Sequence, residues 1–201
     1  MNSPQVFVVD DDISVRESLE GLIRYSGWQA QTFASAEEFL ATSRAVVPSC
    51  LVLDYRLPQL DGLRLQQRLL AQAGHMPVIF ITCYGDPPMA VQAMKAGALE
   101  VLSKPFREDA LLDAIQEGLA RSHTTLLRQE EARRLQQRYA ALSRREREVM
   151  WLVVAGRLNK QIAATLGISE ITVKAHRGRV MRKMKAGSLA ELVGMTIRLD
   201  V

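Results

Sequence analysis

The chain has few cysteines and no long apolar run, and both shortages restrict what it can be. Only two cysteines occur among 201 residues. Cys50 begins one apolar run and Cys83 ends another, so in a parallel sheet they would lie at opposite ends, too far apart for a disulfide. No apolar run approaches the ~18 residues of a membrane-spanning helix. The N-terminal stretch MNSPQVFVVDDD turns acidic where a signal peptide would be apolar. We therefore expect a cytoplasmic protein with two free thiols and no membrane contact.

The net charge of +4 conceals an uneven distribution along the chain. Residues 1–121 hold 10 Lys/Arg against 15 Asp/Glu, whereas residues 142–201 hold 12 against 5. Residues 122–141 lack proline and glycine and are rich in helix-forming residues. This pattern predicts an acidic domain over 1–121, a helical linker over 122–141 with a solvated charged face, and a basic domain over 142–201. The basic domain is expected to bind a polyanion.

The first predicted domain alternates strands with helices. Short apolar runs predict buried strands at 6–9, 50–53 and 78–82, with weaker candidates at 29–33 and 98–102. Amphipathic segments between or after them predict helices at 14–27, 35–43, 62–74, 89–97 and 108–120. A capping box of Ser35 and Glu38 and helix-ending glycines at 27, 74 and 97 support these helices. The fold class is therefore α/β, a (βα)5 doubly wound parallel sheet, whose ligands should bind beyond the carboxyl ends of the strands.

Carboxylates, one hydroxyl and one ammonium group follow the predicted strands. They are Asp10, Asp11 and Asp12 after the first strand, Asp54 after the third, Thr82 after the fourth and Lys104 after the fifth. Clustered carboxylates repel one another unless a cation joins them, and oxygen ligands with open positions suit Mg²⁺. An aspartate beside such an ion can act as nucleophile toward a phosphoryl group. The alternative interpretation is a set of unrelated, solvated strand ends.

The motifs VFVVDDD, LVLDYRLPQLDG, FITCYGD and EVLSKPF resemble those of response-regulator receiver domains, in the same order and spacing. The resemblance implies that Asp54 is the phosphoacceptor and that a sensor histidine kinase is the donor. It further implies roles for the neighbouring residues: Mg²⁺ held by Asp10, Asp11, Asp54 and the backbone carbonyl of Arg56, Thr82 as the switch hydroxyl, and Lys104 as the phosphate-binding cation. Such a domain assists only its own phosphorylation and dephosphorylation, so we do not expect an enzyme.

Two features of this domain depart from the simplest expectation. Many receivers have an aromatic residue three positions before the lysine, where this chain has Val101. The segment GDPPMAVQAMKAG resembles the fourth helix of FixJ-like receivers and is more apolar than one buried stripe requires. A subunit contact and deep packing both explain that excess.

The basic domain shows the start and stop signals of short helices. Ser143 and Glu146 form a predicted capping box, Asn159 is expected to cap the segment KQIAATL, and Gly167 to end it. Ser169 should cap the next helix, and the two helices would form a helix-turn-helix. At 100° per residue, Val173, Val180 and Met184 of the second helix share one face.

The opposite face of that helix is polar and basic. It comprises Thr172, Lys174, Ala175, Gly178, Arg179 and Arg182. Such a face can enter the major groove of DNA, although a solvated helix surface would have the same pattern. The motifs LSRRERE, NKQIAATLGIS and TVKAHR resemble the LuxR-type helix-turn-helix. By that resemblance Lys174, Ala175 and Gly178 face bases, whereas Asn159, Lys160 and Arg177 contact the DNA backbone. Gly178 either removes one base-contacting side chain or permits a closer approach.

Together the two resemblances are those of a NarL/FixJ-type response regulator. The sequence thus predicts a transcription regulator that forms a homodimer on phosphorylation and binds inverted-repeat DNA, with RNA polymerase as a further candidate partner. A HAD-type phosphatase would carry a second aspartate two residues after the nucleophile, where this chain has Arg56. A pure signalling adaptor would not need the basic domain.

Overall fold

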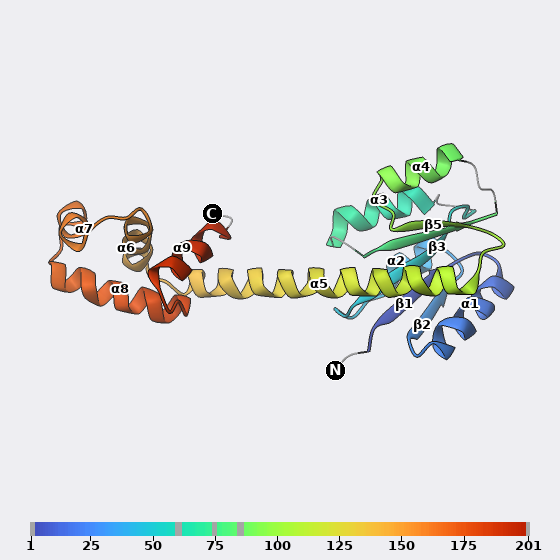
Figure 1. The fold of residues 1–201 in the computed structure, drawn as a ribbon, viewed down its shortest axis with the longest axis horizontal. Helices are drawn as coiled ribbons and strands as arrows, with labels where there is room; N and C mark the ends of the chain where they lie inside the picture. The colour runs from blue at the N-terminus through green and yellow to red at the C-terminus, as the bar shows by residue number, and fades with distance from the viewer. Residues whose placement is uncertain (1–2, 59–61, 74–75, 84–86, 200–201) are drawn as a thin grey trace. The chain divides into compact units, whose positions relative to one another are not determined.

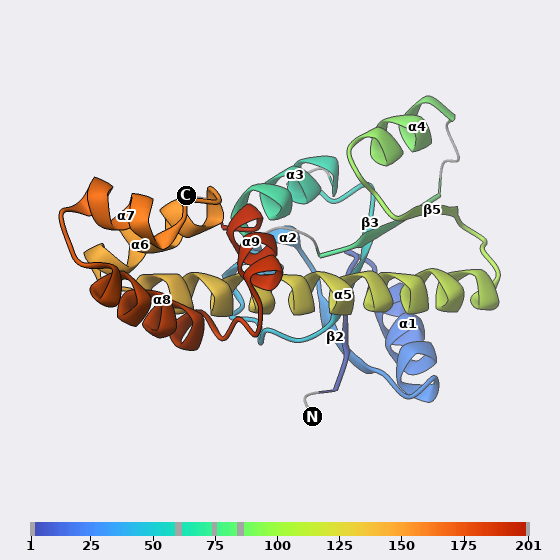
Figure 2. The ribbon, with the colours of Figure 1, turned by 60° about the vertical axis from the view of Figure 1, so that its left-hand side comes forward.

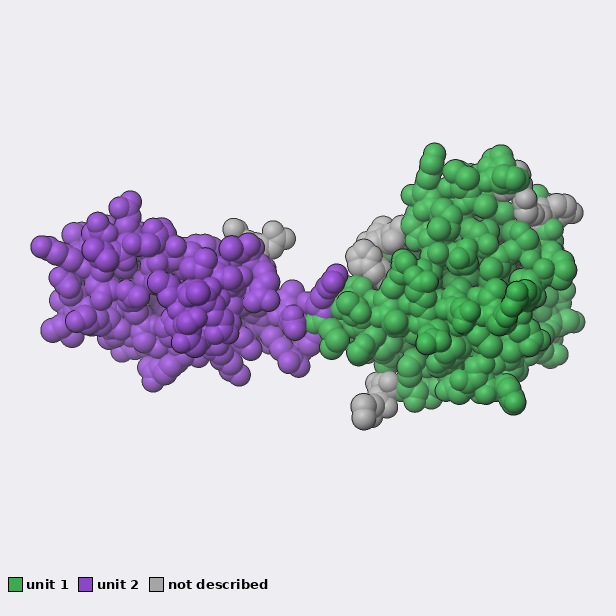
Figure 3. Space-filling model, in the orientation of Figure 1, with its two compact units in different colours: residues 1–127 green, residues 128–201 purple. Residues whose placement is uncertain are grey.

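The computed structural model describes residues 3–58, 62–73, 76–83 and 87–199. The chain divides into two compact units, Met1–Leu127 and Arg128–Val201 (Figure 3). The sequence predicted three segments, 1–121, 122–141 and 142–201, and these boundaries remain a prediction. Among the described residues, no helix is both long and apolar enough to cross a bilayer.

The first unit is built on a five-stranded parallel sheet of order β2-β1-β3-β4-β5 (Figure 1). Its strands are β1 Gln5–Val9, β2 Gln29–Phe33, β3 Ser49–Asp54, β4 Val78–Thr82 and β5 Glu100–Ser103. Successive residues of one strand point to opposite faces of the sheet, and both faces are buried under helices. Phe7 and Val9 therefore enter one core, while Val6 and Val8 enter the other. This confirms the predicted doubly wound α/β fold.

Helices cover both faces of this sheet. They are α1 Ile13–Tyr25, α2 Ala36–Ala41, α3 Gly62–Ala73, α4 Pro87–Lys95 and α5 Glu108–Ala140. Residues of α2, α3 and α4 share one core with Phe7, Leu51 and Phe80. Residues of α1 and α5 share the other core with Val6 and Val52. The two layers leave the carboxyl ends of the strands open at one edge.

The structure confirms some of the predicted helix ends and corrects one predicted capping box. Gly27 and Gly97 have φ values of 86° and 89°, as expected after helix ends, while Gly74 lies outside the described residues. The Ser35 hydroxyl caps α2 through the Glu38 N–H, as predicted. The capping box is wrong in its second half, because the Glu38 carboxylate accepts from the Ala34 N–H instead. The incoming chain presents that earlier N–H to the carboxylate.

Helix α5 is a single element of 33 residues. Its first part buries Leu111 and Ile115 against the sheet, and its last part buries Leu135 in the core of the second unit. The helix includes nearly all of the segment that was predicted to be a helical linker.

The second unit is all-α, and its helices after α5 are α6 Arg144–Val154, α7 Asn159–Leu166, α8 Glu170–Met184 and α9 Leu189–Ile197 (Figure 2). The capping box of Ser143 and Glu146 is present. Gly167 ends α7 in the left-handed region with φ 63°, and the Ser169 hydroxyl caps α8. Helix α9 was not predicted from the sequence, although the Ser188 hydroxyl caps it through the Glu191 N–H.

The predicted cap of α7 is wrong. Leu158 occupies the capping position, and its N–H donates to the Gln161 side chain at 2.9 Å. Asn159 is the first residue of the helix, and its side-chain oxygen accepts a hydrogen bond from Arg177 Nη1 at 2.7 Å. A hydrogen bond from a charged guanidinium is stronger than one from a neutral backbone N–H. The Asn159 side chain therefore links α7 to α8 through Arg177 and does not cap α7.

Both cysteines are free, and they lie in different environments. Cys50 is buried in β3, where a Cβ on Gly118 of α5 would lie only 2.6 Å from its sulfur. Burial raises the pKa of the Cys50 thiol to about 12. Cys83, which directly follows β4, is exposed.

Candidate functional site

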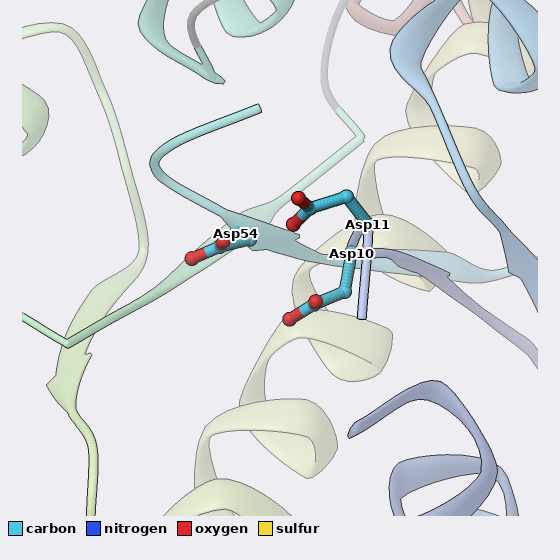
Figure 4. A group of neighbouring side chains, drawn as sticks. All are labelled: Asp10, Asp11 and Asp54. Atoms are coloured by element: carbon cyan, nitrogen blue, oxygen red, sulfur yellow. The ribbon is translucent and has the colours of Figure 1, made fainter. Parts of the chain in front are cut away.

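Strand register brings the predicted acidic residues together. Val9 of β1 lies beside Leu53 of β3, so Asp10 and Asp54 follow at the same edge of the sheet. The side chains of Asp10, Asp11 and Asp54 lie side by side there (Figure 4). One ligand atom from each lies within 4.8 Å of the others. Asp10 and Asp54 are buried and Asp11 is exposed, so solvent reaches the cluster at Asp11.

Asp12 is not part of this acidic cluster. Its side chain accepts from the Ser14 N–H at 2.8 Å and caps α1. Its own N–H donates to Asp10 Oδ1 at 2.9 Å, which fixes the orientation of the Asp10 carboxylate. Asp12 is therefore a structural neighbour of the acidic cluster.

Lys104 supplies the positive charge of the site. Its Nζ lies 2.9 Å from Asp10 Oδ2 and 3.9 Å from Asp54 Oδ1. Its backbone N–H donates to the Thr82 carbonyl at 2.7 Å, so β4 holds the lysine in place. Partial burial lowers the pKa of Lys104, but the hydrogen bond and charge of Asp10 and the charge of Asp54 outweigh it and raise the pKa. Lys104 thus stays protonated.

The site has more negative charge than Lys104 can balance. Burial raises the pKa of Asp54 to about 6; Lys104 opposes this shift, while the charges of Asp10 and Asp11 add to it. Such a carboxylate is stabilised by a further cation nearby. The electrostatics of the site therefore favour a bound metal ion.

The other two predicted site residues of this unit are Thr82, whose carbonyl accepts from the Lys104 N–H, and Arg56, which is close to Asp54 in the chain. Thr82 is the last residue of β4, is 1% exposed, and pairs in register with Ser103. Arg56 follows β3 by two positions and is exposed. Whether its carbonyl binds a metal ion stays a prediction.

Two residues of the site were not identified from the sequence. Arg16 Nη1 donates to the carbonyl oxygens of Asp10 at 2.7 Å and of Asp11 at 3.0 Å, which holds the loop after β1. Gly62 begins α3 against β3, where a Cβ would lie 2.9 Å from both the Asp54 carbonyl oxygen and Phe80 Cε1. No local sequence pattern marks either contact.

The predicted nucleic-acid face lies on α8. Val173, Val180 and Met184 are buried in the core of the second unit. Lys174, Ala175, Gly178, Arg179 and Arg182 are exposed and Thr172 is partly exposed. The Thr172 hydroxyl is hydrogen-bonded to the Ser169 hydroxyl at 2.8 Å. The basic face is thus directed to solvent.

The remaining predicted DNA contacts lie at the start of α7 and on the side of α8. Lys160 is exposed, whereas Asn159 and Arg177 are partly buried and bonded to each other. An ion pair also holds α8: Lys183 Nζ lies 2.6 Å from the buried carboxylate of Glu146 and also donates to the Ala141 carbonyl. These contacts fix α8 against α6 and α7.

Comparison with known proteins finds a matching family for each of the two units. Residues 6–116 match the family model of the response regulator receiver domain, and residues 140–196 match that of bacterial regulatory proteins of the luxR family. Nodulation protein W of Bradyrhizobium diazoefficiens is 50% identical over 98% of this chain and 86% of its own. Transcriptional regulatory protein FixJ of Azorhizobium caulinodans is 46% identical over 98% of this chain and 93% of its own. The solved structure of the response regulator StyR has a TM-score of 0.89 and 47% identity, covering 98% of this chain and 100% of that one.

Proposed function

Because the chain belongs to the response regulators that join a receiver domain to a LuxR-type DNA-binding domain, we propose that Asp54 accepts a phosphoryl group and thereby controls DNA binding by the second unit. The chain is a two-component transcription regulator, so its phosphodonor is a sensor histidine kinase. The observation that carries the assignment of Asp54 is the meeting of three carboxylates and the Lys104 ammonium at one sheet edge.

The acidic cluster fits a magnesium ion. Asp10, Asp11 and Asp54 offer only oxygen ligands, which Mg²⁺ prefers, and their atoms are close enough together for one ion. The backbone carbonyl of Arg56 completes the proposed protein ligands. When bound, Mg²⁺ offsets the negative charge that gathers on the transferred phosphoryl oxygens.

The residues of the chain then divide the work of phosphoryl transfer. A carboxylate oxygen of Asp54 forms a bond to phosphorus while the bond from phosphorus to the donor nitrogen breaks, so no oxidant or reductant is needed. Lys104 Nζ, 3.9 Å from Asp54 Oδ1, is placed to bind an oxygen of the new phosphoryl group. The Thr82 hydroxyl binds another oxygen and acts as the switch.

Phosphorylation of purified protein tests this assignment. Incubation of the full chain with Mg²⁺ and acetyl phosphate should add one phosphoryl group, and Asp54→Asn should abolish the addition. Asp12→Asn is the matched control, because Asp12 caps α1 outside the cluster, and it should be phosphorylated normally. Stoichiometric labelling of the Asp54→Asn protein would contradict the proposal.

The second unit supplies the DNA-binding function. The exposed cations of α8 are suited to phosphates and base edges in the major groove. Lys160, which is exposed at the start of α7, is a further contact to the DNA backbone. Binding should weaken steeply with salt as counterions return to the DNA. Footprinting with and without acetyl phosphate tests the coupling; equal protection of every promoter fragment under both conditions would contradict it.

The coupling we propose is a phosphorylation-dependent homodimer. In α4, Met89 and Ala93 fill the buried stripe, while Val91 and Met94 are 52% and 47% exposed. This distribution supports a subunit contact rather than deep packing as the reason for the apolar excess. A two-fold dimer presents two copies of α8 and should prefer an inverted repeat. We place its action in the cytoplasm, with RNA polymerase as a further partner.

The α4 contact can be tested with a matched pair of variants. Val91→Lys should prevent dimerisation of the phosphorylated protein in sedimentation experiments while leaving the phosphorylated fraction unchanged. Val46→Lys changes an equally apolar residue that is 86% exposed elsewhere in the first unit and should leave dimerisation intact. Normal dimerisation of the Val91→Lys protein would rule out this surface.

A further inference from the structure

The orientation of α8 places one further residue, Ile171, on its outward face beside the predicted DNA contacts. Val173, Val180 and Met184 define the buried side of the helix. At 100° per residue, the line directly opposite their mean direction passes within about 20° of Ile171 and Ala175. Ile171 is thus at the outermost line of the helix, in its first turn.

Ile171 is an apolar side chain that makes little contact with its own fold. It is 79% exposed, although it follows the cap Ser169 by only two positions. An exposed isoleucine is ordinary when it is isolated on a surface. Here it lies on nearly the same line as Ala175 and Gly178, and Arg182 follows on that line toward the end of the helix, so the outward line is apolar in its N-terminal part and cationic at its C-terminal end.

The hydroxyl groups of this first turn are already occupied. Ser169 Oγ accepts from the Thr172 N–H at 3.1 Å and is hydrogen-bonded to Thr172 Oγ1 at 2.8 Å. Thr172 also lies about 100° around the helix from Ile171. At the N-terminal end of α8, where recognition helices contact base edges, Ile171 therefore occupies the outward position.

Beyond Ile171 the face is shallow. Ala175 has one methyl group, and a methyl group added at Gly178 would meet no atom of the described chain within 4 Å. A large apolar side chain followed by two small residues gives the helix a raised end that can enter a groove more deeply than the rest. The major groove offers one apolar feature to such a side chain, the C5 methyl group of thymine.

We propose that Ile171 determines sequence specificity by packing against the C5 methyl group of a thymine in the major groove. The inference rests on the proposed DNA-binding function of α8 and adds a preference for thymine at one position of each half-site. Isoleucine has no hydrogen-bonding group, so this preference depends on contact between apolar surfaces.

Replacement of single thymines by deoxyuridine removes only the methyl group and tests this contact. Duplexes that bind the phosphorylated full-length protein would first be selected from random sequences, and each thymine would then be replaced in turn. For the wild-type protein, one replacement per half-site should weaken binding about three- to tenfold in fluorescence anisotropy. With Ile171→Ala the same replacement should have almost no effect, and Ile171→Val should restore part of it.

Ile197 provides the matched control, because it is 81% exposed at the end of α9 in the same unit. Ile197→Ala should retain the full effect of the methyl group, whatever its overall affinity. Equal sensitivity to deoxyuridine in the wild-type and Ile171→Ala proteins would overturn the inference. So would a loss of transcription activation by Ile171→Ala with unchanged affinity and methyl sensitivity, which would assign Ile171 to a protein contact. A selection that enriched no sequence would overturn the proposed DNA-binding function, and this inference with it.

Discussion

Replacement of Gly62 by alanine should displace the end of β3 that carries Asp54 and thereby disturb the acidic cluster. The backbone of Gly62 approaches β3 so closely that its N–H donates to the Tyr55 carbonyl. A methyl group at this position would lie 2.9 Å from the Asp54 carbonyl oxygen and 2.9 Å from Phe80 Cε1. Both neighbours are held, the first by the sheet and the second by the core, so the strand end that carries Asp54 must shift.

The magnitude of this effect follows from two opposing terms. Overpacking of a well-filled core costs about 1–3 kcal/mol. Alanine also reduces the conformational entropy of the unfolded chain, which stabilises the fold by about 0.4–1 kcal/mol where its conformation is allowed. The net loss in the free energy of unfolding should be about 1–2 kcal/mol. Gly21 of α1 is the matched control, since a methyl group there meets no described atom within 4 Å, and Gly21→Ala should stabilise the protein.

Urea unfolding measures the two variants. Trp28 lies in the first unit and Trp151 in the second, so a Trp151→Phe background lets fluorescence report the first unit alone. Gly62→Ala should lower the urea midpoint and slow phosphorylation by acetyl phosphate, whereas Gly21→Ala should raise the midpoint and leave the rate unchanged. If Gly62→Ala were as stable and as rapidly phosphorylated as Gly21→Ala, the close approach of α3 to Asp54 would be refuted.

Three other predictions concern charge and the switch. The hydrogen bond from Lys183 holds the pKa of Glu146 below its usual 4.5, so the pair stabilises the fold above about pH 4.5 and less as pH falls through the folded pKa. Lys183→Met should therefore lower the free energy of unfolding by about 1–3 kcal/mol near neutral pH. In a plot of Tm against pH, the variant should also show a smaller fall in Tm at acid pH than the wild type. Because burial raises the pKa of Asp54 to about 6, the metal-free fold is destabilised as pH rises from about 4 to 6. Asp54→Asn should raise Tm in EDTA at pH 7.5 and lose that advantage below pH 4; an advantage that persisted there would have another cause. Thr82→Ala should weaken dimerisation far more than Val101→Ala at equal phosphorylation, and the opposite order in sedimentation would refute Thr82 as the switch.

The strands and the acidic cluster could be predicted because they depend on features that are local in sequence. Buried parallel strands are continuous apolar runs, and the run 78–82 is β4 to the residue. Parallel strands also end at a common edge, so aspartates that follow β1 and β3 must come close. The meeting of Asp10, Asp11 and Asp54 needed no further information.

The finer contacts could not be predicted, because the same local pattern leads to different bonds. Serine followed three residues later by glutamate occurs at the starts of α2, α6 and α9. Only Glu146 accepts from the capping residue itself, whereas Glu38 and Glu191 accept from the residue before it. The path of the chain before the helix decides the partner. In the same way, the Arg16 side chain donates to the carbonyl groups of Asp10 and Asp11, and no residue pattern at the start of α1 indicates that contact.

The contrast between the two cysteines makes the native protein suitable for spectroscopy. The Cys50 thiol is buried and its pKa is raised to about 12, so it yields almost no thiolate near neutral pH and is closed to reagents. A maleimide dye or nitroxide spin label should therefore attach to Cys83 alone. The label would lie one residue beyond Thr82 without any engineered mutation. Rearrangement around the phosphorylated site could then be followed in real time by fluorescence or electron paramagnetic resonance.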